Sequence, residues 1–241
     1  MNNSDSSISF HNLTTGYDKG KSYREVSRNL SAELSESTLV ALIGRNGTGK
    51  STLLRTIAGF LPPIEGEVCI DDTAIWTLSR RDLARKIAVV LTRHLETGFL
   101  TVAEIVAMGR QPHTGFSGIL GKRDKEICEK SLKSVNAAHL LQKTFRELSD
   151  GEKQRVMIAK ALAQETPFIL LDEPTAFLDY PSRLETIQML RNLAHDEGKS
   201  ILFSCHDVEI AVSNADKLWL MKKDQITELQ PIEFDLKMLY E

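Results

Sequence analysis

The sequence predicts an α/β fold built around a largely parallel sheet. Short apolar runs alternate with amphipathic helical patterns along the 241 residues, as in strands joined by crossover helices. Two runs, Leu39–Ile43 and Phe168–Leu171, are apolar at every position, which is typical of strands buried on both faces. The composition, with 41% hydrophobic and 26% charged residues, is that of an ordinary folded chain, so bulk disorder is not expected.

Strands and one helix are expected in the first ninety residues. Leu53, Leu54 and Ile57 recur at helical spacing after Lys50, and Gly59 follows where a helix end favours a positive φ. Tyr17 and a short loop are expected to follow the first strand. In chain order, the expected elements are strand 8–13, strand 39–43, helix 50–58, strand 67–70 and strand 87–90.

The stretch 101–148 has a helical pattern and no strong strand. Thr101 and Glu104 have the spacing of a capping box, which predicts that a helix begins there. Residues 111–121 contain one proline and three glycines and are expected to form a loop, and residues 122–135 form a charged amphipathic helix. We therefore expect a helical subdomain, approximately residues 92–165, inserted into the sheet domain.

Strands and helices alternate again after this block and complete the sheet. The expected elements are helix 149–163, strand 168–171, helix 180–195, strand 200–205, helix 207–214 and a terminal hairpin of strands 217–221 and 225–229.

Charge and composition exclude several classes of protein. The 30 basic and 33 acidic residues give a formal net charge of −3, so there is no electrostatic reason to expect a nucleic-acid partner. Cys69, Cys128 and Cys205 are too widely spaced for a metal knuckle or a disulfide framework, which favours buried thiols in a reducing compartment. No apolar run approaches the roughly 18 residues of a membrane span, and no signal peptide is expected.

A glycine-rich segment between strand 39–43 and helix 50–58 has the pattern G-x-x-x-x-G-K-[ST]. Glycines let backbone N–H groups curl around phosphate oxygens, and the helix N-terminus adds partial positive charge. Lys50 would reach the β- and γ-phosphates, and Ser51 would offer its hydroxyl to Mg²⁺. A purely structural turn requires neither the Lys-Ser pair nor the preceding strand. The expected nucleotide-binding residues here are Gly44, Arg45, Asn46, Gly47, Thr48, Gly49, Lys50, Ser51 and Thr52.

Two carboxylates, Asp172 and Glu173, directly follow the apolar run 168–171. They are therefore expected at the carboxyl end of a buried strand, where open α/β sheets bind ligands. Asp172 would hold Mg²⁺, and Glu173 would polarise an attacking water. The alternative, a pair of solvated helix caps, is disfavoured by the phosphate-binding pattern upstream.

Six elements, in order from residue 17 to residue 206, resemble the nucleotide-binding subunit of ABC transporters. The first four are Tyr17, the glycine-rich segment, residues 148–154 (LSDGEKQ, similar to the signature LSGGQ) and the Asp-Glu-Pro-Thr run 172–175. Residues 176–179 resemble the D-loop, and His206 falls where the family has its switch histidine. The resemblance implies a P-loop NTPase of the ABC cassette type. Residues 1–241 would form one cassette with a mixed sheet core, an antiparallel β subdomain and the inserted helical subdomain.

The resemblance also implies ATP and Mg²⁺ as cofactors and assigns roles to residues. Tyr17 would stack on adenine, and His206 would hydrogen-bond to the γ-phosphate and act with Glu173 in catalysis. Ser149 and Gly151 would face the ATP held by a second copy of the chain. From the residues alone, Ser149 could simply cap a helix, and His206 and Tyr17 could be ordinary structural side chains.

Two positions depart from the family pattern. Thr92 stands where we expect the family's metal-binding glutamine, and its shorter side chain could reach Mg²⁺ only through its hydroxyl or a water. Asp150 stands where the signature has glycine. Its carboxylate would repel a γ-phosphate unless it turned away, capped the helix or paired with Lys153 or Arg155, and we expect it to turn away.

Residues 101–113 and 175–179 look most like the ATPases of importers for iron-siderophore, haem or cobalamin. That likeness implies separate integral membrane permease subunits, a second copy of the chain, an indirect periplasmic or surface substrate-binding protein, and a position on the cytoplasmic face of the inner membrane. Three alternatives stay open: an exporter ATPase, a soluble ABC-type ATPase acting on DNA or ribosomes, and a nucleotide-gated binding module with little hydrolysis.

Overall fold

The computed structural model describes residues 6–240 except 19, 21, 93–98 and 116–117. Its central strands are β3 (Leu39–Ile43), β6 (Ile87–Val90), β7 (Phe168–Leu171), β8 (Ser200–Ser204), β9 (Lys217–Met221) and β10 (Ile226–Leu229). They form a six-stranded sheet of order β10-β9-β3-β8-β7-β6. All neighbouring pairs are parallel except β9 and β10, which form an antiparallel hairpin. The expected mixed sheet is therefore present, and strands 39–43, 87–90 and 168–171 have the expected bounds.

Helices cover the sheet and fill the segment between β6 and β7. The α-helices are α1 (Lys50–Ile57), α2 (Arg80–Ala84), α3 (Val102–Ala107), α4 (Lys122–Ser134), α5 (Asp150–Ala163), α6 (Tyr180–Asp196) and α7 (Val208–Asn214). The bounds of α1, α4, α5, α6 and α7 agree with the expected helices to within about two residues at either end. For α3 only the start was predicted, and α2 was not predicted. In the part of the chain that the structure describes, no helix is long and apolar enough to cross a bilayer.

The central strands are apolar throughout because both faces of the sheet are covered. Along β3, Leu39, Ala41 and Ile43 belong to the core that residues of α3–α7 complete. Val40 and Leu42, which point the other way, belong to a second core that contains α1 and the second sheet. Because β3 and β7 both run parallel to β8, the loop after β3 and the loop after β7 lie at the same edge of the sheet.

The second sheet has four antiparallel strands in the order β2-β1-β4-β5: β1 (Ile8–Asp18), β2 (Tyr23–Leu34), β4 (Glu65–Ile70) and β5 (Thr73–Ala74). The prediction that the first strand ends at Leu13 was wrong, because β1 continues through Tyr17 to Asp18. Register shifts within β1 and positive φ angles at Asn12 and Asn29 interrupt the alternation that marks a strand. β2 was not predicted from the sequence, because the same irregular pairing interrupts its alternation of polar and apolar residues.

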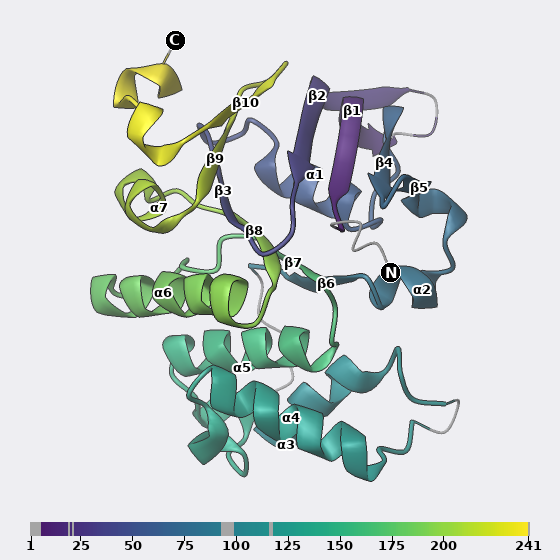
Figure 1. Ribbon diagram of the computed structural model, residues 1–241, viewed down its shortest axis with the longest axis vertical. Helices are drawn as coiled ribbons and strands as arrows, with labels where there is room; N and C mark the ends of the chain where they lie inside the picture. Colours follow the sequence, from purple (N-terminus) through teal and green to yellow (C-terminus); the bar gives the residue numbers. More distant parts are fainter. Residues whose placement is uncertain (1–5, 19, 21, 93–98, 116–117, 241) are drawn as a thin grey trace.

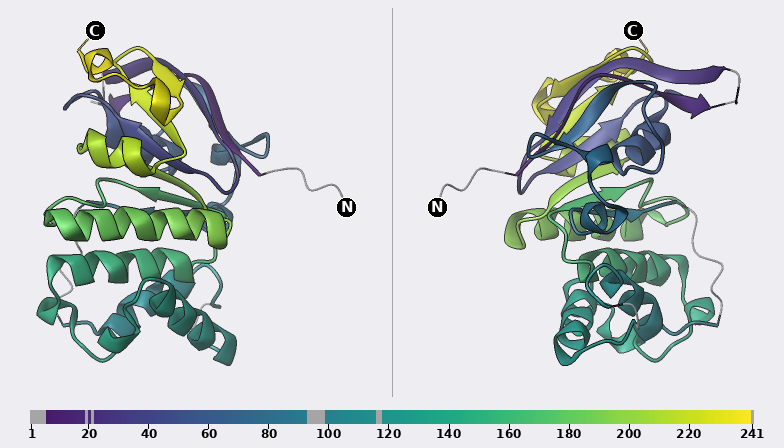
Figure 2. Two further views of the ribbon diagram at one scale, coloured as in Figure 1. Left: turned by 60° about the vertical axis from the view of Figure 1, so that its left-hand side comes forward. Right: turned by 90° about the vertical axis from the view of Figure 1, so that its right-hand side faces the viewer.

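The helices between β6 and β7 form the end of the molecule farthest from the four-stranded sheet (Figure 1; Figure 2 shows the same arrangement from two other sides). Their packing is held by Arg110, whose side chain is only 3% exposed. The guanidinium donates to Asp124 Oδ1 (2.9 Å), to Glu165 Oε2 (2.7 Å) and to the Ala163 carbonyl (2.7 Å). One buried cation thus ties the chain after α3 to the beginning of α4 and the end of α5.

Candidate nucleotide-binding site

The loop between β3 and α1 has a shape that requires its glycines. Gly44 and Gly49 have φ angles of 156° and 105°. A Cβ on Gly44 would lie 2.4 Å from the Met221 carbonyl oxygen, and one on Gly49 would lie 2.7 Å from Val26 Cγ1. Since side chains cannot occupy these places, the backbone can curve closely around a ligand and present its N–H groups at the start of α1.

Lys50, the first residue of α1, is buried in this loop, with 6% of its surface exposed. Its Nζ donates to the carbonyls of Gly44 (2.8 Å) and Arg45 (3.2 Å). Burial lowers the pKa of the ammonium, and the nearby carboxylates of Glu173 and Asp172 act in the opposite direction. The side chain is therefore held at the position where the motif places phosphate.

Asp172 stands at the carboxyl end of β7 and accepts two hydroxyl hydrogen bonds on Oδ1. Ser51 Oγ, at the start of α1, donates at 2.8 Å, and Ser204 Oγ, at the end of β8, donates at 2.9 Å. Hydroxyl and carboxylate oxygens are ligands that Mg²⁺ binds together with waters and phosphate oxygens. Ser51 and Asp172 therefore fit a Mg²⁺ that binds together with a nucleotide. Among the described residues, no group of three or more His, Cys, Asp or Glu side chains could hold a metal ion.

Glu173 and His206 meet beside this pair. Glu173 Oε1 and His206 Nε2 are 2.5 Å apart, and the histidine side chain is 46% exposed. The backbone of Glu173 is in the left-handed region, with φ of 51°, a conformation that costs a residue other than glycine about 1–3 kcal/mol. Strain of this size at a carboxylate that faces a cavity is a feature of functional sites.

Lys50, Ser51, Glu173 and His206 line one cavity of about 380 Å³, and Asp172 lies behind it through its hydrogen bond with Ser51. The cavity is bounded by Val26, Asn46, Gly47, Gly49, Lys50, Ser51, Thr52, Glu173 and His206. Residues from three distant segments of the sequence therefore converge as expected. Tyr17 lies close by, since its hydroxyl is 3.2 Å from Thr52 Oγ1, and it is 37% exposed. Val26 and Ser204 were not predicted, because Val26 lies on the unexpected strand β2 and only the pairing of β7 with β8 brings Ser204 to Asp172.

Ser149 and Gly151 are not brought to this cavity in the single chain. They line a second one, of about 330 Å³, at the start of α5. Ser149 caps α5 in the expected capping box, since its Oγ accepts from the Glu152 N–H (3.3 Å) and its own N–H donates to Glu152 Oε2 (2.8 Å). The Asp150 carboxylate pairs with Lys153 at 3.2 Å, one of the arrangements considered for this departure from the signature.

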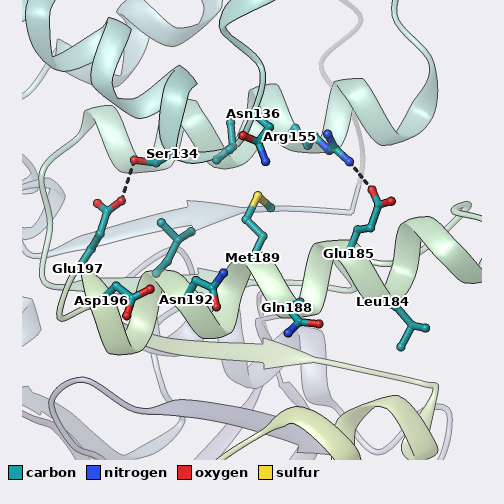
Figure 3. Close-up of a pocket in the computed structure, with 12 residues that line it drawn as sticks. Ser134, Asn136, Arg155, Leu184, Glu185, Gln188, Met189, Asn192, Asp196 and Glu197 are labelled. Atoms are coloured by element: carbon teal, nitrogen blue, oxygen red, sulfur yellow. Dashed lines mark hydrogen bonds and ion pairs between the residues drawn. The ribbon is translucent and has the colours of Figure 1, made fainter.

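A larger groove, of about 720 Å³, lies between α6 and the helical segment that joins β6 to β7. Figure 3 shows that its walls are joined at two points, by Ser134 with Glu197 (2.7 Å) and by the ion pair of Arg155 with Glu185. It contains none of the phosphate-loop or carboxylate residues. Size alone therefore does not identify the site, and the convergence of motif residues on the smaller cavity does.

The phosphate loop after β3 and the carboxylates at the end of β7, which lies beyond β8 in the same sheet, define the class of P-loop nucleotide-binding proteins. A family model described as ABC transporter matches residues 27–176. The chain therefore belongs to the ABC transporter family, within which it has the fold of an ATP-binding cassette.

Two relatives illustrate the similarity. The chain is 43% identical over 215 residues to an uncharacterised ABC transporter ATP-binding protein of Methanocaldococcus jannaschii, covering 89% of this chain and 73% of the relative. It is 37% identical over 199 residues to the petrobactin import ATP-binding protein of Bacillus anthracis, covering 83% and 73%.

Two solved structures are similar as well. One is a metal-chelate type ABC transporter in an inward-facing conformation, with a TM-score of 0.83, 27% identity, and coverage of 98% of this chain and 87% of that one. The other is a dimeric bacterial ABC transporter cassette, with a TM-score of 0.79, 28% identity, and coverage of 93% and 98%.

Proposed function

We propose that this chain binds and hydrolyses ATP to drive import of an iron-siderophore, haem or cobalamin-type substrate through separate permease subunits. The observation that carries the enzymatic part is the single cavity where Lys50, Ser51, Glu173 and His206 meet. The cargo class is supported by the petrobactin importer and by the metal-chelate type transporter, to which this chain is similar. The segment 92–165 would be the helical subdomain, and the whole chain one cassette.

The mechanism follows from the positions of the side chains. The backbone amides after Gly44 and the Lys50 ammonium would bind the β- and γ-phosphates, and Tyr17 would stack on the base at the edge of the cavity. Bound Mg²⁺, held by Ser51 and Asp172, would neutralise charge on the phosphates. Glu173 would accept a hydrogen bond from the attacking water and orient it, and His206, 2.5 Å from that carboxylate, would contact the γ-phosphate.

The signature residues give a reason for a second copy of the chain. Ser149 and Gly151 lie at the start of α5 in a cavity separate from the phosphate loop. The partial positive charge of a helix start favours an anion, so in a head-to-tail dimer the start of α5 would face the partner's ATP. The dimeric cassette among the similar structures supports this arrangement. A permease and, indirectly, a substrate-binding protein would complete the importer at the inner face of the membrane.

Replacing Lys50 with Ala tests the enzymatic proposal. We expect ATP affinity to fall by at least tenfold and hydrolysis to be lost, because the buried ammonium is the cation at the phosphate position. Affinity is measured by calorimetry and turnover by phosphate release. Lys122→Ala is the matched control, since that lysine side chain is 93% exposed. ATP binding by Lys50→Ala as tight as that of the parent would refute the assignment.

The same variant tests the cargo. In cells whose own copy is replaced by Lys50→Ala, uptake of a labelled ferric siderophore, haem or cobalamin should stop, whereas Lys122→Ala cells should take it up normally. Unchanged uptake of all three, with hydrolysis abolished in the purified variant, would exclude this cargo class and leave the ATPase assignment intact.

A further inference from the structure

The peptide bond between Asp172 and Glu173 is held at both of its polar ends by side chains. The Thr92 hydroxyl donates to the Asp172 carbonyl oxygen at 2.8 Å. The N–H of Glu173, on the same peptide plane, donates to Ser204 Oγ at 2.8 Å. Rotation of this peptide would break both hydrogen bonds.

The position of Thr92 follows from the pairing of β6 with β7. In this parallel ladder, the Asp172 N–H donates to the Val90 carbonyl at 2.8 Å, and the next rung would join residue 92 to the Asp172 carbonyl. At that point β6 has ended, and the chain leaves the sheet toward the helical segment. The Thr92 hydroxyl therefore supplies a hydrogen bond to Asp172 beyond the end of the strand.

The clamped peptide determines where the Glu173 carboxylate points. Glu173 has a strained φ of 51°, so the surrounding contacts must maintain its conformation. On its far side, the Glu173 carbonyl accepts from the Ala176 N–H at 3.0 Å. Loss of the Thr92 contact would leave the Asp172 carbonyl without this donor and allow the peptide to turn, which would displace the carboxylate.

We propose that Thr92 is a positioning residue: its hydroxyl holds the Asp172–Glu173 peptide and thereby fixes the Glu173 carboxylate for the attacking water. The catalytic consequence rests on the proposed ATPase function, but the clamp itself does not. The assignment gives Thr92 a task different from metal binding, the role expected from its place in the sequence. The first residue of the connection to the helical segment thus touches the backbone of the catalytic glutamate.

Hydrogen exchange on the nucleotide-free, metal-free protein tests the clamp directly. Thr92→Val removes the hydroxyl and keeps the shape, and Thr92→Ser keeps the hydroxyl. We expect exchange in the fragment 168–177 to become about fivefold faster in Thr92→Val, the factor for roughly one net hydrogen bond, and to stay near the parent rate in Thr92→Ser. Thr92→Ala serves as the second hydroxyl deletion if Thr92→Val does not fold. Unchanged exchange in the hydroxyl deletion would overturn the proposal.

Kinetics then separate positioning from metal binding. For Thr92→Val we expect kcat for ATP to fall by about tenfold, the factor for roughly 1.4 kcal/mol of transition-state stabilisation, with KM for ATP unchanged and activity restored in Thr92→Ser. A loss that disappears when Mg²⁺ is raised would assign Thr92 to the metal and overturn the positioning role. If the parent protein hydrolyses no ATP, the proposed function fails, and the exchange result still decides whether the clamp exists.

Discussion

Glu173 shows how a local motif depends on distant residues. The run of apolar residues before Glu173 predicts the position of this carboxylate at the end of a strand. Its left-handed backbone, however, is maintained by contacts from β8 and from the end of β6. The motif residues could be predicted because each signal is contained in a few consecutive positions. Ser204 and the clamp by Thr92 could not, because they arise only when β6, β7 and β8 pair side by side.

Cys205 offers a prediction at the scale of a single residue. Its thiol is 1% exposed and donates to the Asp207 carbonyl at 3.3 Å, across the turn that carries His206. Burial raises the pKa of this thiol to about 11, so roughly one molecule in a thousand is ionised at pH 8. We expect Cys205 to resist iodoacetamide at pH 8 in the native protein, and the raised pKa implies that stability falls as pH rises from 9 toward 11.

The half-buried Cys69 is the internal comparison for this labelling. Mass spectrometry of digests taken at intervals gives the rate at each thiol, and a sample unfolded in denaturant gives the rate without burial. Labelling of native Cys205 as fast as labelling of Cys69 would contradict the burial of the Cys205 thiol.

Secondary structure was predictable where one physical signal dominated. β3 and β7 are buried on both faces, so their apolar runs have the expected ends. The capping boxes at Thr101 and Ser149 mark the starts of α3 and α5. By contrast, β1 and β2 contain register shifts, and most of β2 alternates poorly between polar and apolar residues. Those strands are specified by pairing with each other, which no local pattern records.

Arg110 supports a prediction at the scale of the elements. It is a buried cation between the segment after α3, the start of α4 and the end of α5, and its hydrogen bond holds the pKa of Asp124 below the usual range. Arg110→Met should lower the free energy of unfolding by about 2–3 kcal/mol, below the full value for a buried pair because the Asp124 and Glu165 side chains keep some contact with water.

Urea denaturation measures this loss, and Lys122→Met provides the control. Lys122 makes a solvent-exposed pair with Glu126, so its replacement should change stability by no more than about 0.5 kcal/mol. An Arg110 variant as stable as the Lys122 variant would show that the buried ion pairs do not hold the helical segment together.

At the scale of the whole molecule, the two halves of the proposed ATP site lie in different cavities of one chain. The phosphate loop, Glu173 and His206 line one, and Ser149 and Gly151 line the other. Neither the composition nor the net charge indicates such a division. Only the resemblance of residues 148–154 to the family signature indicates this division. The division explains why a second copy of the chain would be required for turnover.

The most direct test combines assembly with turnover in Glu173→Gln. With ATP and Mg²⁺, light scattering should give a mass of about twice 27.0 kDa, because ATP that is bound but not hydrolysed would keep two chains closed, and turnover should fall by roughly 10²–10⁴ as the water loses its orienting carboxylate. A variant that stays at 27.0 kDa and hydrolyses ATP at the parent rate would contradict both the dimer and the role of Glu173.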